Sequence, residues 1–292
     1  MIPIGFTLQP ERRFLDGCAP LLDAVDYFEV APETLWRTDE SGALLPNGFH
    51  RRFAKLKQHT GKQFVAHGVG YSLGSTASDD RARRRAFRER IAADAHTFEF
   101  AWWTDHLGAT SLDGLAFTLP MPLPLDARTA TIVRRRLGEM QTVVADVGLE
   151  NSVVHFTLGD PLDEPQFLER ALAAPGTHLL LDLHNVYTMA QNFHFDPAEY
   201  LRQLDLSRVI EIHVSGGSDS DAAWLPSGRV MRLDGHDGAV PEAVWQLCET
   251  WAPRCPRLRG LTLERMEGTV ADEDDVARLA DELRRLRGIA ER

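Results

Sequence analysis

The feature of this chain that most constrains its fold is the regular alternation of short apolar runs with longer stretches of helical periodicity. Eight short runs of β-type residues follow one another, at 2–8, 27–31, 64–69, 102–107, 147–151, 178–185, 209–215 and 260–266. The stretches between them carry apolar residues three and four positions apart, most clearly at 127–146, 164–173, 197–204, 241–251 and 272–290. Eight strands that alternate with helices predict an α/β fold, the (β/α)8 TIM barrel, as one domain over residues 1–292.

One predicted loop stands out by its length. Residues 216–230 follow the seventh predicted strand and are rich in Gly, Ser and Asp. Loops longer than about 12–15 residues in a compact domain are usually functional. We therefore expect this loop to be a lid or an insertion.

Charge and cysteine content argue against several classes of protein. The chain has 43 Asp and Glu against 32 Lys and Arg, a net charge of −11, so nucleic acid is not expected to be its main partner. Its three cysteines contain no Cys-x-x-Cys pair and form no disulfide framework, which fits a reducing cytosol. No apolar run approaches the roughly 18 residues of a membrane span. We expect a soluble cytoplasmic protein with no membrane partner.

Histidines and carboxylates end six consecutive predicted strands, and in a TIM barrel the carboxyl ends of the strands carry the chemistry. These residues are His67, His106, Glu150, Asp182 with His184, His213 and Glu264, and the long loop is followed by Asp234 and His236. Imidazole nitrogens and carboxylate oxygens suit zinc, iron or manganese, whereas a structural zinc site would need thiolates. Nine candidate ligands exceed the needs of one ion. A bridging carboxylate, for which Glu150 is the candidate, would hold two or three ions about 3.5–4 Å apart.

A simpler interpretation competes with a metal site. A single His or Glu at a strand end is more often a hydrogen-bonded or exposed residue than a ligand. Six such strands in succession are hard to explain in that way, because buried carboxylates and imidazoles in one barrel mouth are costly without a cation. The sequence therefore favours a multinuclear metal site.

Two further features are open to more than one interpretation. Glu29 and Glu33, near the end of the second predicted strand, fit either residues that support metal ligands or salt-bridge partners. The arginine-rich run at 81–90, RARRRAFRER, fits a strip that binds phosphate or peptide. A charge run on a helix is, however, usually a solvated face.

Short segments around the candidate ligands occur in an order typical of one enzyme family. They are 28–33 (FEVAPE), 67–70 (HGVG), 72–75 (SLGS), 105–107 (DHL), 149–151 (LEN), 180–187 (LLDLHNVY), 192–197 (NFHFDP), 211–213 (EIH), 234–237 (DGHD) and 263–265 (LER). Over residues 1–267 the chain resembles the multinuclear non-heme iron-dependent oxidative enzymes, the family of the methanobactin-biosynthesis iron oxidase. That family belongs to the xylose-isomerase-like barrels.

The resemblance implies a distribution of the ligands over three ions. His67, His106 and Glu150 would hold one iron. A second iron would be held by Glu150, Asp182, His213 and Glu264. Asp234 and His236, with the 182–185 segment that contains His184 and Asn185, would hold a third and looser ion.

The resemblance also implies an activity. Family members look like tailoring enzymes of ribosomally made peptides (RiPPs), which use O2 and a mixed-valent Fe(II)/Fe(III) pair to oxidise a residue of a precursor peptide, frequently a cysteine. A separate protein that binds the leader peptide often delivers this substrate. On this basis Glu150 and Asp182 are the residues expected at the reacting centre.

The chain departs from the family pattern at the sixth predicted strand. It has Asp182-Leu183-His184-Asn185 where the family commonly has Asp-Val-Asn-Asn. Strand alternation would place His184 on the same face as Asp182 and would add an imidazole to the third site. Together with smaller departures at 104–106, 151–152 and 192–194 and the atypical long loop at 216–230, this suggests a divergent branch, in which the modified residue need not be cysteine.

Two other functions compete with the oxidase. A similar barrel with nearly the same order of ligands occurs in zinc phosphodiesterases of the endonuclease IV type, which cut DNA at abasic sites. The net charge of −11 argues against a DNA enzyme. A barrel that binds a peptide without catalysis would have no need of the complete ligand set.

Overall fold

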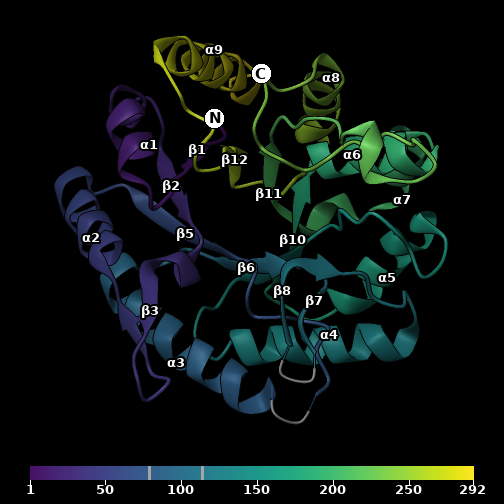
Figure 1. Cartoon of the computed structure of the whole chain (residues 1–292), viewed down its shortest axis with the longest axis horizontal. Helices are drawn as coiled ribbons and strands as arrows, with labels where there is room; N and C mark the ends of the chain where they lie inside the picture. Colours follow the sequence, from purple (N-terminus) through teal and green to yellow (C-terminus); the bar gives the residue numbers. More distant parts are fainter. Residues whose placement is uncertain (78–79, 113–114) are drawn as a thin grey trace.

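Eight parallel strands close a barrel in the computed structural model, which describes residues 1–77, 80–112 and 115–292. The order around the barrel is β1-β12-β11-β10-β9-β6-β5-β2 (Figure 1). The strands are β1 (Ile4–Thr7), β2 (Tyr27–Val30), β5 (Gln63–Gly68), β6 (Trp103–His106), β9 (Val147–Glu150), β10 (Thr177–Asp182), β11 (Val209–Val214) and β12 (Gly260–Leu263). The predicted TIM barrel is confirmed, and each of the eight predicted strands contributes to it.

Helices surround the barrel on its outside (Figure 1). They are α1 (Arg12–Gly17), α2 (Gly48–Thr60), α3 (Asp80–Phe98), α4 (Ala127–Met140), α5 (Glu164–Ala171), α6 (Leu183–Phe193), α7 (Pro197–Gln203), α8 (Glu242–Trp251) and α9 (Glu273–Ala290). Short 3-10 helices lie at Ala19–Leu21, Pro32–Leu35, Pro161–Asp163, Leu206–Arg208, Ala222–Trp224 and Ala252–Arg254. In the described part of the chain, no helix combines the length and apolar character that a membrane crossing requires.

The predicted boundary of the sixth strand is wrong. The strand was expected to continue to residue 185, but β10 ends at Asp182 and α6 begins at Leu183. The carboxylate of Asp182 caps this helix by accepting a hydrogen bond of 2.6 Å from the backbone nitrogen of Asn185. His184 therefore lies in the first turn of a helix, and strand alternation does not determine its direction.

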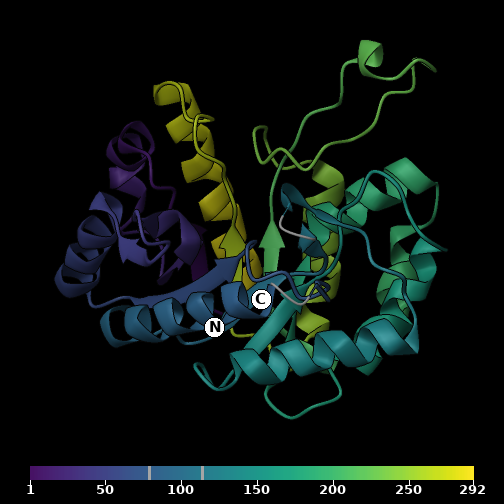
Figure 2. The ribbon, with the colours of Figure 1, turned by 60° about the horizontal axis from the view of Figure 1, so that its bottom comes forward.

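Two hairpins and a long excursion extend from the barrel, and the hairpins were not predicted. One hairpin pairs β3 (Trp36–Thr38) with β4 (Leu44–Pro46), and the other pairs β7 (Ala109–Leu112) with β8 (Leu115–Met121). The predicted long loop projects away from the barrel (green in Figure 2). Its two arms pair through an isolated antiparallel bridge between Asp219 and Arg232.

The interior of the barrel has a polar floor built around Glu211. Its carboxylate accepts hydrogen bonds from the hydroxyl of Tyr27 at 2.8 Å and from the indole of Trp102 at 2.6 Å. The ring of Tyr27 needs space that only glycine leaves: a Cβ on Gly260 would lie 2.1 Å from its hydroxyl oxygen. Each acceptor on this floor is matched by a donor, as burial requires.

Candidate metal centre

The strand register brings the predicted ligands to one level at the carboxyl end of the barrel. His106 is the register partner of Glu150 across β6 and β9. Asp182 is the partner of His213 across β10 and β11. Glu264 directly follows β12, so it reaches the same level. Closure of the barrel thus brings residues that are far apart in the sequence together in one cluster.

The first group consists of His67, His106 and Glu150. Oε2 of Glu150 lies 3.0 Å from Nε2 of His106 and 3.4 Å from Nε2 of His67. The two imidazole rings are stacked, with centroids 4.7 Å apart. Both rings therefore direct the same nitrogen toward one carboxylate oxygen.

The other nitrogen of each ring has its own partner. Nδ1 of His106 lies 3.0 Å from the carbonyl oxygen of Gly68, and Nδ1 of His67 lies 2.9 Å from the hydroxyl of Thr104. A carbonyl only accepts, so Nδ1 of His106 carries the proton and the lone pair of the neutral ring is on Nε2. Such partners fix ring orientation and tautomer in metal sites.

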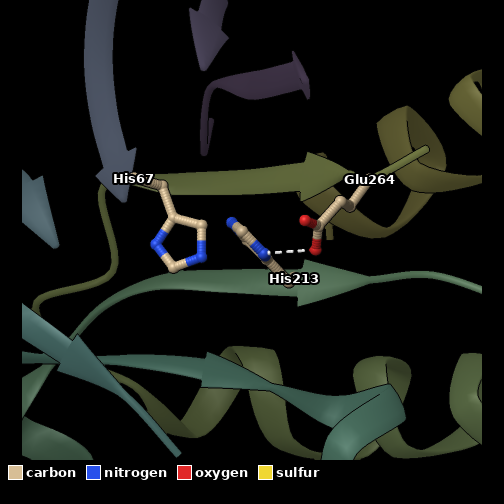
Figure 3. A group of neighbouring side chains, drawn as sticks. All are labelled: His67, His213 and Glu264. Carbon is tan, nitrogen blue, oxygen red and sulfur yellow. Dashed lines mark hydrogen bonds and ion pairs between the residues drawn. The ribbon is translucent and has the colours of Figure 1, made fainter. Parts of the chain in front are cut away.

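The second group consists of Glu150, Asp182, His213 and Glu264. Nδ1 of His213 lies 2.9 Å from Oε2 of Glu264 and 4.0 Å from Oδ2 of Asp182. Figure 3 shows the ring of His213 between His67 and Glu264. Glu150 belongs to both groups and is the carboxylate that joins them.

The roles of Glu29 and Glu33, which the sequence left open, are distinct in the structure. Oε2 of Glu29 lies 2.9 Å from Nε2 of His213, on the side of the ring away from Glu264. Glu33 instead accepts hydrogen bonds from the backbone nitrogens of Val69 and Gly70, at 2.6 and 2.7 Å. Glu29 therefore supports a candidate ligand, and Glu33 fixes the loop that follows β5.

The candidates for a third ion meet around Asp234. Oδ1 of Asp234 lies 2.7 Å from Nε2 of His236 and 3.1 Å from Nδ1 of His184. Nδ1 of His236 lies 3.2 Å from Oε1 of Glu264, which joins these residues to the second group. His184 thus contacts Asp234 from helix α6, and not from the sixth strand, which ends at Asp182.

Asn185 lies beside the shared carboxylate. Its Nδ2 donates hydrogen bonds to Oε1 of Glu150 at 3.1 Å and to the carbonyl oxygen of Asn151 at 3.2 Å. Its place in the fold is therefore that of a residue that orients Glu150.

The neighbouring charges and the burial of the cluster raise the pKa of several of its groups. Burial opposes protonation of His67, but the nearby carboxylate of Glu150 outweighs burial and raises the pKa of His67 to about 9. Burial likewise opposes protonation of His213, but Glu29 and Glu264 raise its pKa well above the usual value. Burial and the negative charge of Glu150 raise the pKa of Asp182. A bound cation would replace these protons.

Unpartnered atoms in the cluster fit metal ligation. Several buried side-chain atoms form no hydrogen bond of suitable geometry among the residues that the structure describes, although some of them lie within ion-pair distance of a neighbour. In this cluster they are Nε2 of His67, Oε2 of Glu150, Oδ2 of Asp182, Nε2 of His184, Oδ1 of Asn185 and Nδ1 of His236. Buried polar atoms without partners are rare and costly, and nitrogen and oxygen donors of this kind suit iron, zinc or manganese.

Comparison with known proteins places this cluster in a family. A family model described as "RiPP precursor modification enzyme MbnB/TglH/ChrH" matches residues 4–291. A UPF0276 protein of Caulobacter vibrioides is 32% identical over 254 residues, which are 86% of this chain and 82% of that protein. A UPF0276 protein of Rhizorhabdus wittichii is 31% identical over 282 residues, which are 95% of this chain and 90% of that protein.

Solved structures with the same fold include several enzymes. A D-tagatose 3-epimerase-like protein covers 99% of both chains with a TM-score of 0.64 and 14% identity. Endonuclease IV from Thermus thermophilus covers 98% of this chain and 99% of its own, with a TM-score of 0.55 and 16% identity. Such low identities show a shared xylose-isomerase-like barrel fold and nothing of the reaction. The family match over almost the whole chain shows that this protein belongs to the RiPP precursor modification enzymes of the MbnB/TglH/ChrH family.

Proposed function

We propose that this protein is a non-heme iron-dependent oxidase that uses O2 to modify a residue of a ribosomally made precursor peptide. Membership of the family supports a precursor peptide as the substrate. The imidazole and carboxylate groups support two or three bound metal ions, and iron is the redox-active metal that suits them. Bound iron would supply the one-electron chemistry that the reduction of O2 requires.

The position of Glu150 is the observation on which this function mainly rests. The carboxylate lies within 3.4 Å of Nε2 of both His67 and His106. It also belongs to the group that contains Asp182 and His213. A carboxylate shared by two ligand groups would contribute to the binding of both ions.

Three candidate histidine ligands are oriented by partners on the far side of the ring. His67 and His106 present Nε2 because Thr104 and Gly68 engage their other nitrogens. His213 presents Nδ1 because Glu29 engages its Nε2. Preorganised ligands of this kind lower the cost of metal binding. We assign Glu150 and Asp182 to the reacting centre, where they balance the positive charge of the ions.

A third and looser ion is assigned to Asp234 and His236, with His184 as an additional imidazole ligand. These side chains lie at the base of the long excursion and in the first turn of α6. Asn185, which orients Glu150, links this region to the first two ions.

We assign the precursor peptide to a cleft beside the loop that follows the ligand His67. A cleft of about 910 Å³ lies between the β3–β4 hairpin, α3 and the β7–β8 hairpin. Its lining includes Trp36, Phe87, Val69 and Gly70, and the last two closely follow the ligand His67. Mostly apolar clefts with a few polar groups suit side-chain recognition. We assign this cleft to the residues around the modified one, with the leader segment held by a separate partner protein.

Metal content of the Glu150→Gln variant tests the assignment of the shared carboxylate. Loss of the bridging charge should lower bound iron by at least one ion per chain while the barrel still folds, because the amide retains the size of the side chain. Glu282→Gln is the matched control. Glu282 is also buried and accepts a hydrogen bond from the backbone of Val240 at 2.8 Å, outside every ligand group described above. Wild-type iron content and full peptide oxidation in Glu150→Gln would contradict the proposal.

A further inference from the structure

The arginine-rich run at 81–90 forms one wall of a second cleft, on the outside of the barrel. This cleft has a volume of about 690 Å³ and lies between α3 and α4. Its charged lining consists of six arginines and one glutamate: Arg81, Arg84, Arg85, Arg88, Arg135, Arg136 and Glu139. Both helices lie on the same side of the barrel (Figure 1). In a chain of net charge −11, this is a strong local concentration of positive charge.

Two of these arginines are buried, one in the run on α3 and one on α4, so the cleft is more than a solvated helix face. Arg84 is 2% exposed and Arg136 is 5% exposed. The guanidinium groups of both donate to the same carbonyl oxygen, that of Ser75, at 3.3 Å. Arg84 also bonds Asp80. Long cationic side chains are rarely buried to this degree, which indicates a built site.

The carboxylates around the cleft leave part of its positive charge unbalanced. Glu139 is shared by Arg136 at 2.6 Å, Arg88 at 2.9 Å and Arg84 at 3.8 Å. Glu89 pairs with Arg85 at 3.8 Å. Burial and the neighbouring charge of Arg136 lower the pKa of Arg84. Arg81 and Arg135 are exposed at the rim, and neither forms an ion pair with another described residue. The cleft therefore has an excess of positive charge that an additional anion would balance.

The same arginines connect the cleft to the loop behind the metal centre. Arg88 donates a hydrogen bond of 2.8 Å to the hydroxyl of Tyr71. The hydroxyl of Tyr71 donates to Glu139 at 3.0 Å. Tyr71 lies four residues after His67, a ligand of the first group. A ligand in the cleft would thus lie next to residues that contact Tyr71, in the loop that follows the ligand His67.

We propose that the α3–α4 cleft binds an acidic segment of the precursor peptide, at a distance from the residue that is modified. Planar guanidinium groups match carboxylates in a two-point geometry, and several together select a run of acidic side chains. The assignment of this anion to the precursor peptide rests on the proposed function. Nucleic acid is disfavoured because the excess of positive charge is confined to one cleft on an acidic protein.

Fluorescence anisotropy with a labelled hexaglutamate peptide tests this inference on the full chain. Wild type should bind hexaglutamate, with weaker binding at higher salt, and should not bind labelled hexalysine. The double variant Arg81→Glu/Arg135→Glu should weaken binding at least about tenfold, because it reverses two charges at the rim. Both residues are exposed, so the fold should be retained.

The matched control is the double variant Arg12→Glu/Arg51→Glu, which makes the same change in net charge at exposed positions on α1 and α2. Its affinity for hexaglutamate should stay within about twofold of wild type, since screened charges that are far away contribute little. Equal weakening by both double variants would overturn the inference, as would tighter binding of a single-stranded hexanucleotide than of hexaglutamate. None of these results depends on iron, so failure of the proposed oxidase would be seen separately, in the metal content.

Discussion

Glu29 and Glu264 hold the two nitrogens of His213 from opposite sides, each at 2.9 Å. Glu29 is fully buried and also accepts a hydrogen bond from the hydroxyl of Thr7 at 3.0 Å. A carboxylate behind a ligating histidine fixes the ring and makes the opposite nitrogen a stronger donor. We therefore propose that Glu29 acts on the second metal ion as a positioning residue, through the ring of His213.

Replacement of Glu29 should weaken the binding of the second ion more than that of the other ions. Glu29→Leu removes the acceptor for Nε2 of His213 and should lower the affinity of this ion about 10–100-fold. Glu29→Gln keeps an acceptor of the same size and should have a smaller effect. Competitive titration with a chelator measures both affinities, and thermal unfolding checks that the barrel remains folded. Equal affinity in wild type and Glu29→Leu would show that Glu29 has no such role.

The metal-free protein should become less stable as the pH rises from 6.5 to about 9. A histidine whose pKa is raised on folding stabilises the fold fully below its ordinary pKa and loses that contribution as the pH passes the folded value. His67 behaves in this way with a folded pKa of about 9, and the pKa of His213 is raised in the same direction. The melting temperature of chelator-treated protein should fall over this interval, with a shallower fall in His67→Gln. A melting temperature that rises over the same interval would contradict the predicted direction.

Gly217→Ala should displace the third ion alone. A Cβ at this position would lie 2.3 Å from the carbonyl oxygen of Leu233 and 2.8 Å from Cε1 of His184. The loop or the histidine must therefore shift away from Asp234, while the groups that share Glu150 keep their geometry. Metal analysis should find one ion fewer than in wild type. Gly159→Ala, where a Cβ would meet no atom within 4 Å, is the control and should bind as wild type does.

The barrel fold, and the position of most candidate ligands at its carboxyl end, could be predicted from the sequence. The reason is that each strand end is marked by a local sequence pattern. His67, His106, Glu150 and His213 each follow an apolar run, and the fold then fixes where such ends meet. His184 was predicted in the wrong element, although a signal was present. Asp182 has the residue type and position of a helix N-cap, before a helical stretch that contains Val186 and Met189.

The partner of His213 could not be predicted, because it depends on contacts across the barrel. Glu29 and His213 are 184 residues apart, and no local pattern shows which carboxylate faces which ring. The hairpins β3–β4 and β7–β8 were missed for another reason. Their strands are partly exposed, so they lack the strong apolar period that identifies the barrel strands. These hairpins nevertheless form much of the 910 Å³ cleft.

The most direct measurement is the metal content and oxidation state of protein purified without chelator from iron-supplemented cells, by elemental analysis with Mössbauer and EPR spectroscopy. A pair bridged by Glu150 predicts two or more irons per chain and a mixed-valent signal that is lost in Glu150→Gln. Stoichiometric zinc that iron does not replace would contradict the oxidase, and an assay of abasic-site DNA cleavage would then test the hydrolase.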